Sequence, residues 1–231
     1  MKVSCEEAFF FSEDESRLID AEYLLTVNVA KEMARLNNYI GVPYKIYLEK
    51  PTREFASDCV PLMGRLPASN FLGYRSTLRK SKNTTRNGKI DVVVYRDGVS
   101  FRKPVCAIEL KGFNPRREVV LQDLKRNGEY FSLSCVSGSS QISFSVFAAL
   151  HSFRKTHTTG SVKKDLQTLQ AKYNGWLSKL GSSRNYKNNI RAFTISKSLA
   201  DEQAIPPDEE FSEFESHHFV GVMVTFYGRN G

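Results

Sequence analysis

Two apolar runs, residues 89–95 and 104–111, are separated by a short turn, and each carries charge where a buried strand is otherwise apolar. The first run holds Asp91, and the second holds Glu109 followed two residues later by Lys111. Burying a charged side chain is costly unless it is paired or coordinates a metal ion. The two runs therefore predict neighbouring strands that carry a charged site within a sheet.

Helical and strand-like patterns alternate around these two strands. The spacing of apolar residues predicts helices over 13–37, 116–130 and 162–180, and strands over 44–48, 142–150, 190–195 and 219–227. Residues 50–74 are interrupted by Pro and Gly, which predicts irregular chain. Mixed strands with helices on both sides are typical of an α/β protein with a three-layer α/β/α arrangement around a central mixed sheet.

The length of 231 residues suits one domain. We expect its core over residues 13–150 and a C-terminal extension of sheet and helix over residues 160–231. Residues 50–88 form a basic, irregular insertion in this division. The acidic stretch 201–215 is expected to be a surface loop or a short helix.

The charge of the chain is uneven and predicts a polyanionic partner. The formal net charge is +8, but residues 201–215 hold seven acids and no Lys or Arg, so the remaining residues carry +15. A basic segment directly before Asp91 could follow a phosphate backbone, although a solvated loop can have the same composition. Its cations are Arg75, Arg79, Lys80, Lys82, Arg86 and Lys89.

Several classes of protein are disfavoured by the pattern of residues. The four cysteines form no Cys-x-x-Cys pair, which argues against a zinc ribbon or a disulfide scaffold. No segment has the pattern of a signal peptide or of a membrane span, so a cytoplasmic protein without a membrane partner is expected. No glycine-rich phosphate loop occurs, so no nucleotide cofactor is expected. His217 and His218 have no acidic partner at metal-ligand spacing and predict a strand-edge pair.

The two predicted strands can assemble a site for a hard cation. Glu109 and Lys111 share one face of their strand, and Asp91 meets them if the register aligns. Mg²⁺, or Mn²⁺ in its place, prefers oxygen ligands and keeps several waters, so Asp91, Glu109 and the backbone carbonyl of Leu110 would suffice. Lys111 would orient or help to deprotonate the attacking water. The alternative, an ion pair on an exposed strand, fits poorly with the apolar run 105–110.

These residues resemble the PD-(D/E)xK nuclease superfamily of restriction-endonuclease-like proteins. Asp91 in Ile90-Asp91-Val92-Val93 and the triplet Glu109-Leu110-Lys111 match its motif, although Ile90 stands where the motif has Pro. The resemblance implies a restriction-endonuclease-like core in which the acids bind Mg²⁺ and the lysine serves the water. The Gln-x-x-x-Tyr pattern of the exonuclease branch is absent, because Arg126 occupies the Tyr position.

The resemblance also implies that two helices contribute to the site. On the first helix Glu22 is the best positional match, with Glu15 and Glu32 as alternatives. On the helix after the lysine strand, Gln122 matches a polar position that is common in the family, and its neighbour Asp123 could take that role.

The sequence therefore predicts a Mg²⁺-dependent DNA endonuclease, with a homodimer as one way to cut both strands. The alternative is a catalytically inactive nucleic-acid-binding protein of the same fold. A weaker alternative is a protein-interaction module that uses residues 201–215.

Overall fold

The computed structural model describes ten stretches of the chain. They are residues 1–4, 7, 21–40, 44–60, 88–97, 102–135, 138–153, 159–181, 184–197 and 218–228. The residues predicted to begin the first helix (13–20), most of the basic segment and the acidic stretch 201–215 lie outside the described residues.

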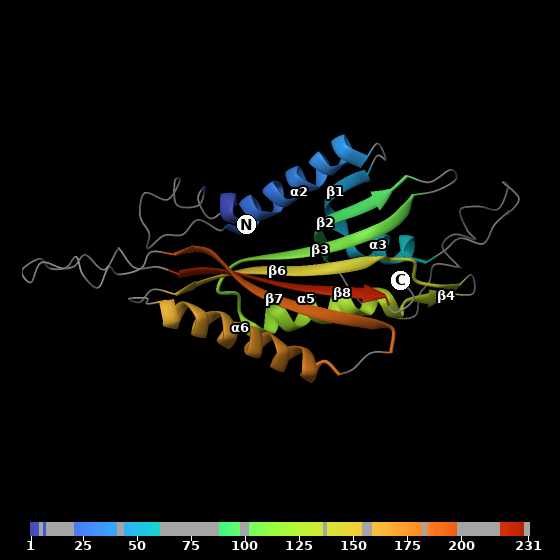
Figure 1. The fold of residues 1–231 in the computed structure, drawn as a ribbon. Helices are drawn as coiled ribbons and strands as arrows, with labels where there is room; N and C mark the ends of the chain where they lie inside the picture. The colour runs from blue at the N-terminus through green and yellow to red at the C-terminus, as the bar shows by residue number, and fades with distance from the viewer. Residues whose placement is uncertain are drawn as a thin grey trace, which may run out of the picture.

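A six-stranded mixed sheet forms the centre of the molecule, so the predicted α/β class with a mixed sheet is confirmed (Figure 1). Its strand order is β1-β2-β3-β6-β8-β7, and every neighbouring pair is antiparallel except the parallel pair β3 and β6. The strands are β1 (Tyr44–Pro51), β2 (Lys89–Arg96), β3 (Lys103–Phe113), β6 (Phe144–Phe153), β7 (Tyr186–Lys197) and β8 (His218–Gly228). The short strands β4 (Ser134–Cys135) and β5 (Gly138–Ser139) pair separately.

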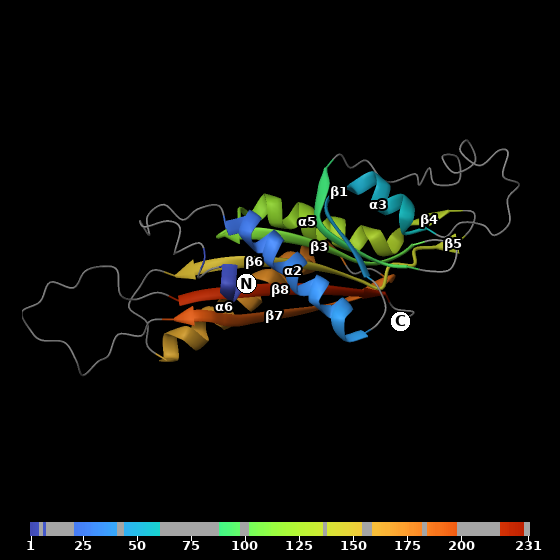
Figure 2. The same ribbon diagram turned by 90° about the horizontal axis from the view of Figure 1, so that it is seen from above.

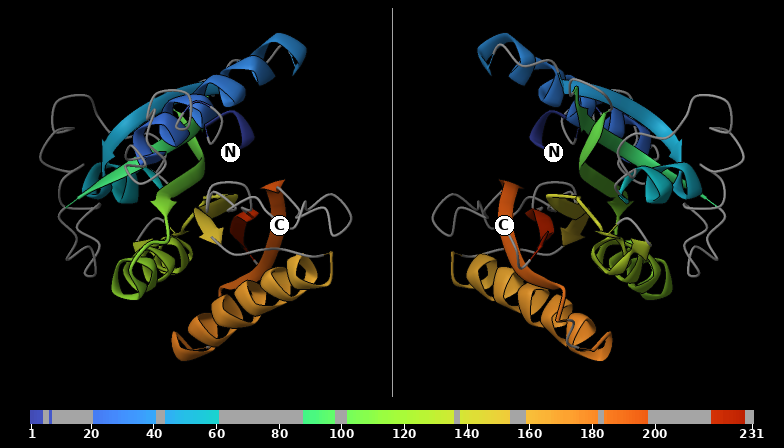
Figure 3. Two further views of the ribbon diagram at one scale, coloured as in Figure 1. Left: turned by 90° about the vertical axis from the view of Figure 1, so that its left-hand side faces the viewer. Right: turned by 90° about the vertical axis from the view of Figure 1, so that its right-hand side faces the viewer.

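Helices pack against both faces of this sheet (Figures 2 and 3). Helix α2 (Ala21–Ile40) covers one face, where Leu25 joins a core cluster with Val92 and Ile108. Helices α5 (Arg117–Glu129) and α6 (Thr159–Lys179) cover the other face together with α3 (Thr52–Asp58). The alternation of side chains along each strand supplies apolar residues to both cores.

The predicted irregular chain from residue 50 is wrong for its first part, because Thr52–Asp58 forms helix α3. Pro51 directly precedes this helix with φ −54°, a value that is compatible with a helix start. Phe55 and Ala56 are buried in the core beneath β1 and β2, and this tertiary contact stabilises a helix of only seven residues. None of the described helices is long and apolar enough to span a membrane.

His218 joins helix α6 to the last two strands. Its Nδ1 lies 3.0 Å from Asp165 Oδ2 on α6, and its Nε2 lies 2.9 Å from Thr194 Oγ1 on β7. The side chain is fully buried and stacks on Phe153. His218 is the first residue of β8, as predicted, but its burial and its acidic partner on α6 were not predicted, because Asp165 is distant in the sequence. His217 lies outside the described residues.

Two glycines are expected to respond in opposite ways to substitution by alanine. A Cβ at Gly221 would lie 2.7 Å from the Phe193 ring on the paired strand, so Gly221→Ala forces that ring to move and should cost about 1–3 kcal/mol. A Cβ at Gly175 meets nothing within 4 Å, so Gly175→Ala in α6 should stabilise by roughly 0.5–1 kcal/mol. Urea unfolding measures both, and a destabilising Gly175→Ala would contradict the expected helix effect.

Candidate active site

Asp91 and the Glu109–Lys111 segment meet where β2 and β3 pair. The register places Val92 opposite Ile108, which brings Asp91 beside the end of β3 that carries Glu109. The backbone N–H of Leu110 donates a hydrogen bond to Asp91 Oδ2 at 2.6 Å. The structure therefore brings together the two acidic strand positions that the sequence singled out.

The Lys111 ammonium group contacts oxygen atoms from three elements, α2, β3 and α5. Its Nζ donates to Glu22 Oε1 at 2.7 Å and to the carbonyl of Leu110 at 2.8 Å, and it lies 3.6 Å from Asp123 Oδ2. Burial lowers the pKa of Lys111. The hydrogen bond to Glu22 and the nearby carboxylates of Asp123 and Asp91 raise it by a larger amount, so the net shift of the pKa is upward. The ammonium group is therefore held charged and in a fixed position.

Glu109 is buried and paired with a residue that was not predicted to belong to the site. Its side chain is 2% exposed, and Arg126 Nη1 on α5 donates to its Oε1 at 2.8 Å. Arg126 also lies 3.4 Å from Asp123 Oδ1. The spacing of Asp123 and Arg126, three residues apart on one helix, places both above the strand that carries Glu109.

The helix residues proposed from the resemblance are placed unequally. Glu22 contacts Lys111, whereas Glu32 is exposed and pairs with Arg35 at 2.6 Å. Gln122 is exposed on α5 and is not brought into this cluster, while its neighbour Asp123 is buried within it. Glu15 lies outside the described residues.

Among the predicted nucleic-acid contacts, Lys89 alone lies within the described residues. Its Nζ is 3.5 Å from Glu49 Oε2, and its backbone carbonyl accepts a bond from Arg126 Nη1 at 3.4 Å. The side chain of Lys89 is exposed, and Lys89 precedes Asp91 by two residues on β2. The cations Arg75, Arg79, Lys80, Lys82 and Arg86 lie outside the described residues.

Burial makes three carboxyl groups of this cluster, those of Glu109, Asp91 and Asp123, weaker acids than usual. It raises the pKa of Glu109 to about 8, with Asp123 and Asp91 adding to the shift and Arg126 opposing it. It raises the pKa of Asp91 to about 6, against the opposing Leu110 hydrogen bond and the charge of Lys111. The pKa of Asp123 is also raised, first by burial. Together with Glu22, the cluster contains four acidic side chains and two cationic ones, Lys111 and Arg126.

These pKa shifts predict that the metal-free protein becomes less stable as pH rises. Between the unfolded pKa values near 4 and the folded values of about 6 and 8, the folded state binds more protons than the unfolded state. The free energy of unfolding should therefore fall by several kcal/mol from pH 4 to pH 8.5, with the larger part lost as the pH approaches 8. Urea unfolding in EDTA checks this, and Glu109→Gln should flatten the slope; an unchanged slope in that variant would contradict the assignment.

The cluster supplies oxygen atoms of the kind that the Mg²⁺ implied by the resemblance prefers, but two of the predicted ligands contact protein cations: Glu109 accepts from Arg126, and the carbonyl of Leu110 accepts from Lys111. Carboxylate and carbonyl oxygens are the ligands that this ion prefers, and the excess of acids over cations favours a further positive charge. Asp123 Oδ2 is buried without a hydrogen-bond partner. Within the described part of the chain, no three acidic, His or Cys side chains are arranged to hold a metal ion. The residues that would hold one are Asp91, Glu109 and the carbonyl of Leu110, with water completing the shell.

Comparison of the chain with protein-family models, with curated proteins and with solved structures found no match. The chemistry of this cluster therefore rests on its own residues and geometry.

Proposed function

We propose that this protein is a Mg²⁺-dependent endodeoxyribonuclease of the PD-(D/E)xK type. The observation that carries the proposal is that Asp91, Glu109 and Lys111 lie close together on the paired strands β2 and β3. Glu22 of α2 contacts Lys111 in the same cluster. Three of these residues are acids and the fourth is a lysine whose side chain is only partly exposed. A cluster of this composition suits the binding of a hard cation beside a positively charged group that faces a phosphate.

The topology around the cluster supports the same proposal. Helix α2 precedes three antiparallel strands, and α5 then crosses over to β6, which lies parallel to β3. This is the order of elements that the resemblance to restriction-endonuclease-like proteins implies. The crossover also brings Asp123 and Arg126 of α5 to the strand that carries Glu109 and Lys111.

Each residue of the cluster has a role that follows from its contacts. Bound Mg²⁺ would supply a more acidic water and would neutralise charge on the scissile phosphate. Lys111 presents an ammonium group, whose position Glu22 and Asp123 fix through two ion pairs. Such an ammonium can orient the attacking water and stabilise negative charge. Arg126 donates a hydrogen bond to the buried carboxyl group of Glu109 and compensates its charge when that group is ionised.

DNA is the proposed substrate because the charge of the chain favours a polyanion. Outside residues 201–215 the chain carries +15. The basic segment from Arg75 to Lys89 leads directly into the strand of Asp91, and Lys89 is exposed at its end. Binding that depends on such cations weakens steeply with salt. A second copy of the chain could supply the site for the opposite strand.

Cleavage of DNA tests the proposal directly. Wild-type protein with Mg²⁺ should nick and linearise supercoiled plasmid DNA and should cut long genomic DNA, whereas EDTA should stop both reactions. Asp91→Asn keeps the size of the side chain but removes a metal-binding charge, so the rate should fall by about 100-fold or more. Asp97→Asn, on the residue that follows β2, is the matched control and should retain the wild-type rate. Equal cleavage by Asp91→Asn would overturn the assignment, and faster cleavage of RNA of matched length would overturn the choice of DNA.

A second candidate function is a DNA-binding protein without turnover. The ion pair between Arg126 and Glu109 favours it, because a guanidinium group already occupies one of the two carboxylates that would hold the metal. Salt-dependent DNA binding without cleavage in Mg²⁺ or Mn²⁺ would support this function over the first.

A further inference from the structure

A polar pocket lies at the opposite end of β3 from the candidate active site. Its volume is about 630 Å³, within the range of sites for small ligands. Lys103 lines it at the start of β3, six residues before Glu109, which corresponds to about 20 Å along an extended strand. The pocket and the acidic cluster are therefore separate sites.

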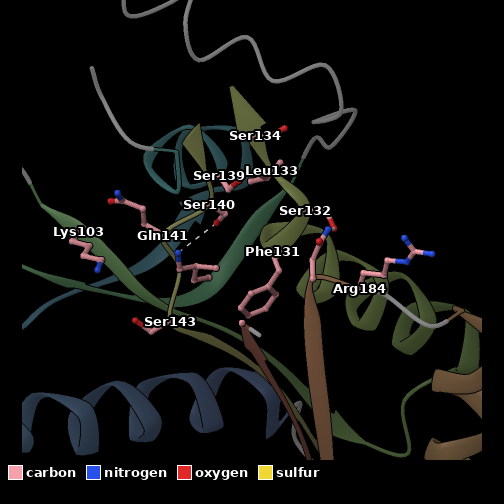
Figure 4. A pocket seen from close by; sticks show the side chains of 13 residues that line it. Lys103, Phe131, Ser132, Leu133, Ser134, Ser139, Ser140, Gln141, Ser143 and Arg184 are labelled. Atoms are coloured by element: carbon pink, nitrogen blue, oxygen red, sulfur yellow. Dashed lines mark hydrogen bonds between the residues drawn. The ribbon is translucent and has the colours of Figure 1, made fainter. Parts of the chain in front are cut away.

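The floor of the pocket is apolar and its walls are polar. Phe131, Leu133 and Ile142 are almost fully buried and contribute the apolar part. Five serines, Gln141 and Asn185 contribute hydroxyl and amide groups around them. Figure 4 shows the Phe131 ring between Lys103 and Ser143 on one side and Arg184 on the other.

The charge of the pocket has one sign. Lys103 and Arg184 line it, and its described lining contains no Asp or Glu. Neither cation has an ion-pair partner among the residues that the structure describes. The Arg184 side chain points outward in Figure 4, and an exposed arginine rotates readily enough to turn toward a ligand.

Hydrogen bonds fix the walls between these groups. Asn185 Nδ2 donates to Ser132 Oγ at 3.0 Å, which ties the start of β7 to the end of the α5 region. The backbone N–H of Ser140 donates to the carbonyl of Leu133 at 2.8 Å, which closes the turn that carries the serines. The pocket is thus largely formed before any ligand arrives.

We propose that this pocket binds a nucleoside monophosphate, either free or as the phosphorylated end of a DNA strand. A planar base suits the apolar floor at Phe131, a sugar suits the hydroxyl and amide groups, and a phosphate suits Lys103 and Arg184. Binding here requires neither a metal ion nor cleavage of DNA, so it stands independently of the proposed nuclease.

Calorimetric titration of the full chain with dAMP in EDTA tests this inference. Wild type should bind dAMP, and Lys103→Gln combined with Arg184→Gln should weaken binding about tenfold or more. Ser143→Trp should fill the pocket and weaken binding similarly, without changing a charge. Lys163→Gln, an exposed change on α6, is the control and should leave affinity unchanged. Absence of dAMP binding by the wild type, or equal affinity in the pocket variants, would overturn the inference.

Titrations with inorganic phosphate and with an oligonucleotide show which part of the ligand is recognised. A variant of the acidic cluster shows whether dAMP binds in the pocket or in that cluster. Inorganic phosphate should bind at least tenfold more weakly than dAMP, and equal affinity would overturn the nucleoside assignment. A short oligonucleotide with a 5′-phosphate that binds more tightly than dAMP supports a strand end, and the reverse order supports a free nucleotide. Lys111→Met should bind dAMP as wild type does, because binding that needs Lys111 would place it in the acidic cluster instead.

Discussion

Lys111→Met is expected to lower the rate of Mg²⁺-dependent DNA cleavage by about 10²–10³-fold. The ammonium group of Lys111 is held by Glu22 at 2.7 Å and lies 3.6 Å from Asp123, within the cluster that also contains Asp91 and Glu109. The other cation of this cluster within the described residues, Arg126, is engaged with Glu109 at 2.8 Å. Single-turnover cleavage of a labelled duplex measures the loss at the chemical step.

Two further variants separate a catalytic role of Lys111 from a structural one. Lys111→Arg keeps a positive charge beside Glu22 and Asp123 but cannot readily exchange a proton with water. It should retain most of the stability toward urea and still cleave at least tenfold more slowly than wild type. Lys45→Met removes an exposed lysine at the edge strand and should have no effect on the rate. Wild-type cleavage by Lys111→Met would show that the lysine has no part in the reaction.

Arg126→Met is expected to cause the largest loss of stability among the single changes at the site. The substitution leaves the carboxylate of Glu109 buried without its 2.8 Å partner and removes a charge near Asp123. Breaking a buried ion pair on one side typically costs about 3–5 kcal/mol. Urea unfolding above pH 8, where Glu109 is ionised, should show the full cost. Near pH 6 the cost should be smaller, because the raised pKa of Glu109, about 8, keeps it protonated there.

Arg35→Met provides a matched control for this stability change. Arg35 pairs with Glu32 at a similar distance of 2.6 Å, but both side chains are more than 60% exposed. Exposed ion pairs contribute about 0–1 kcal/mol, so the control should change stability little. Arg126→Met combined with Glu109→Leu should recover much of the loss, since no charge remains buried without a partner. A loss in Arg126→Met no larger than in Arg35→Met would contradict the role assigned to this ion pair.

The strands of the site could be predicted from sequence because alternation within a strand is local. Asp91, Glu109 and Lys111 stand out against apolar neighbours, and their shared face follows from a period of two residues. The pairing of β2 with β3 could also be expected, because a short turn joins two runs of similar length. Each of these steps needs only nearby residues.

The contribution of α5 could not be predicted in the same way. The buried residues of α5 are Val120, Asp123, Leu124, Asn127 and Gly128. Because only two of the five, Val120 and Leu124, are large and apolar, the helical spacing of apolar residues does not reveal the inward face. Gln122 differs from Asp123 by one position, which turns a side chain by about 100° around the helix axis. The resemblance favoured Gln122 and left Asp123 as its alternative, and the structure places Asp123 rather than Gln122 in the cluster. The pairing of Arg126 with Glu109 was not predicted.

The remaining differences have equally physical causes. Helix α3 spans seven residues, fewer than the window over which helical periodicity is visible. The partner of His218 is 53 residues away on α6, so the pair depends on the packing of that helix against the sheet. Contacts of this kind are set by tertiary structure rather than by local pattern.

The contact between Glu22 and Lys111 joins residues 89 positions apart, and it has a consequence for how the protein acquires activity. Closing so long a loop costs entropy that only a nearly complete core can offset. During folding the acids of α2, β2, β3 and α5 stay apart and hydrated until the sheet and both helical faces have formed. A nascent or partly unfolded chain therefore lacks the assembled cluster. The proposed cleavage activity is expected only in the fully folded protein.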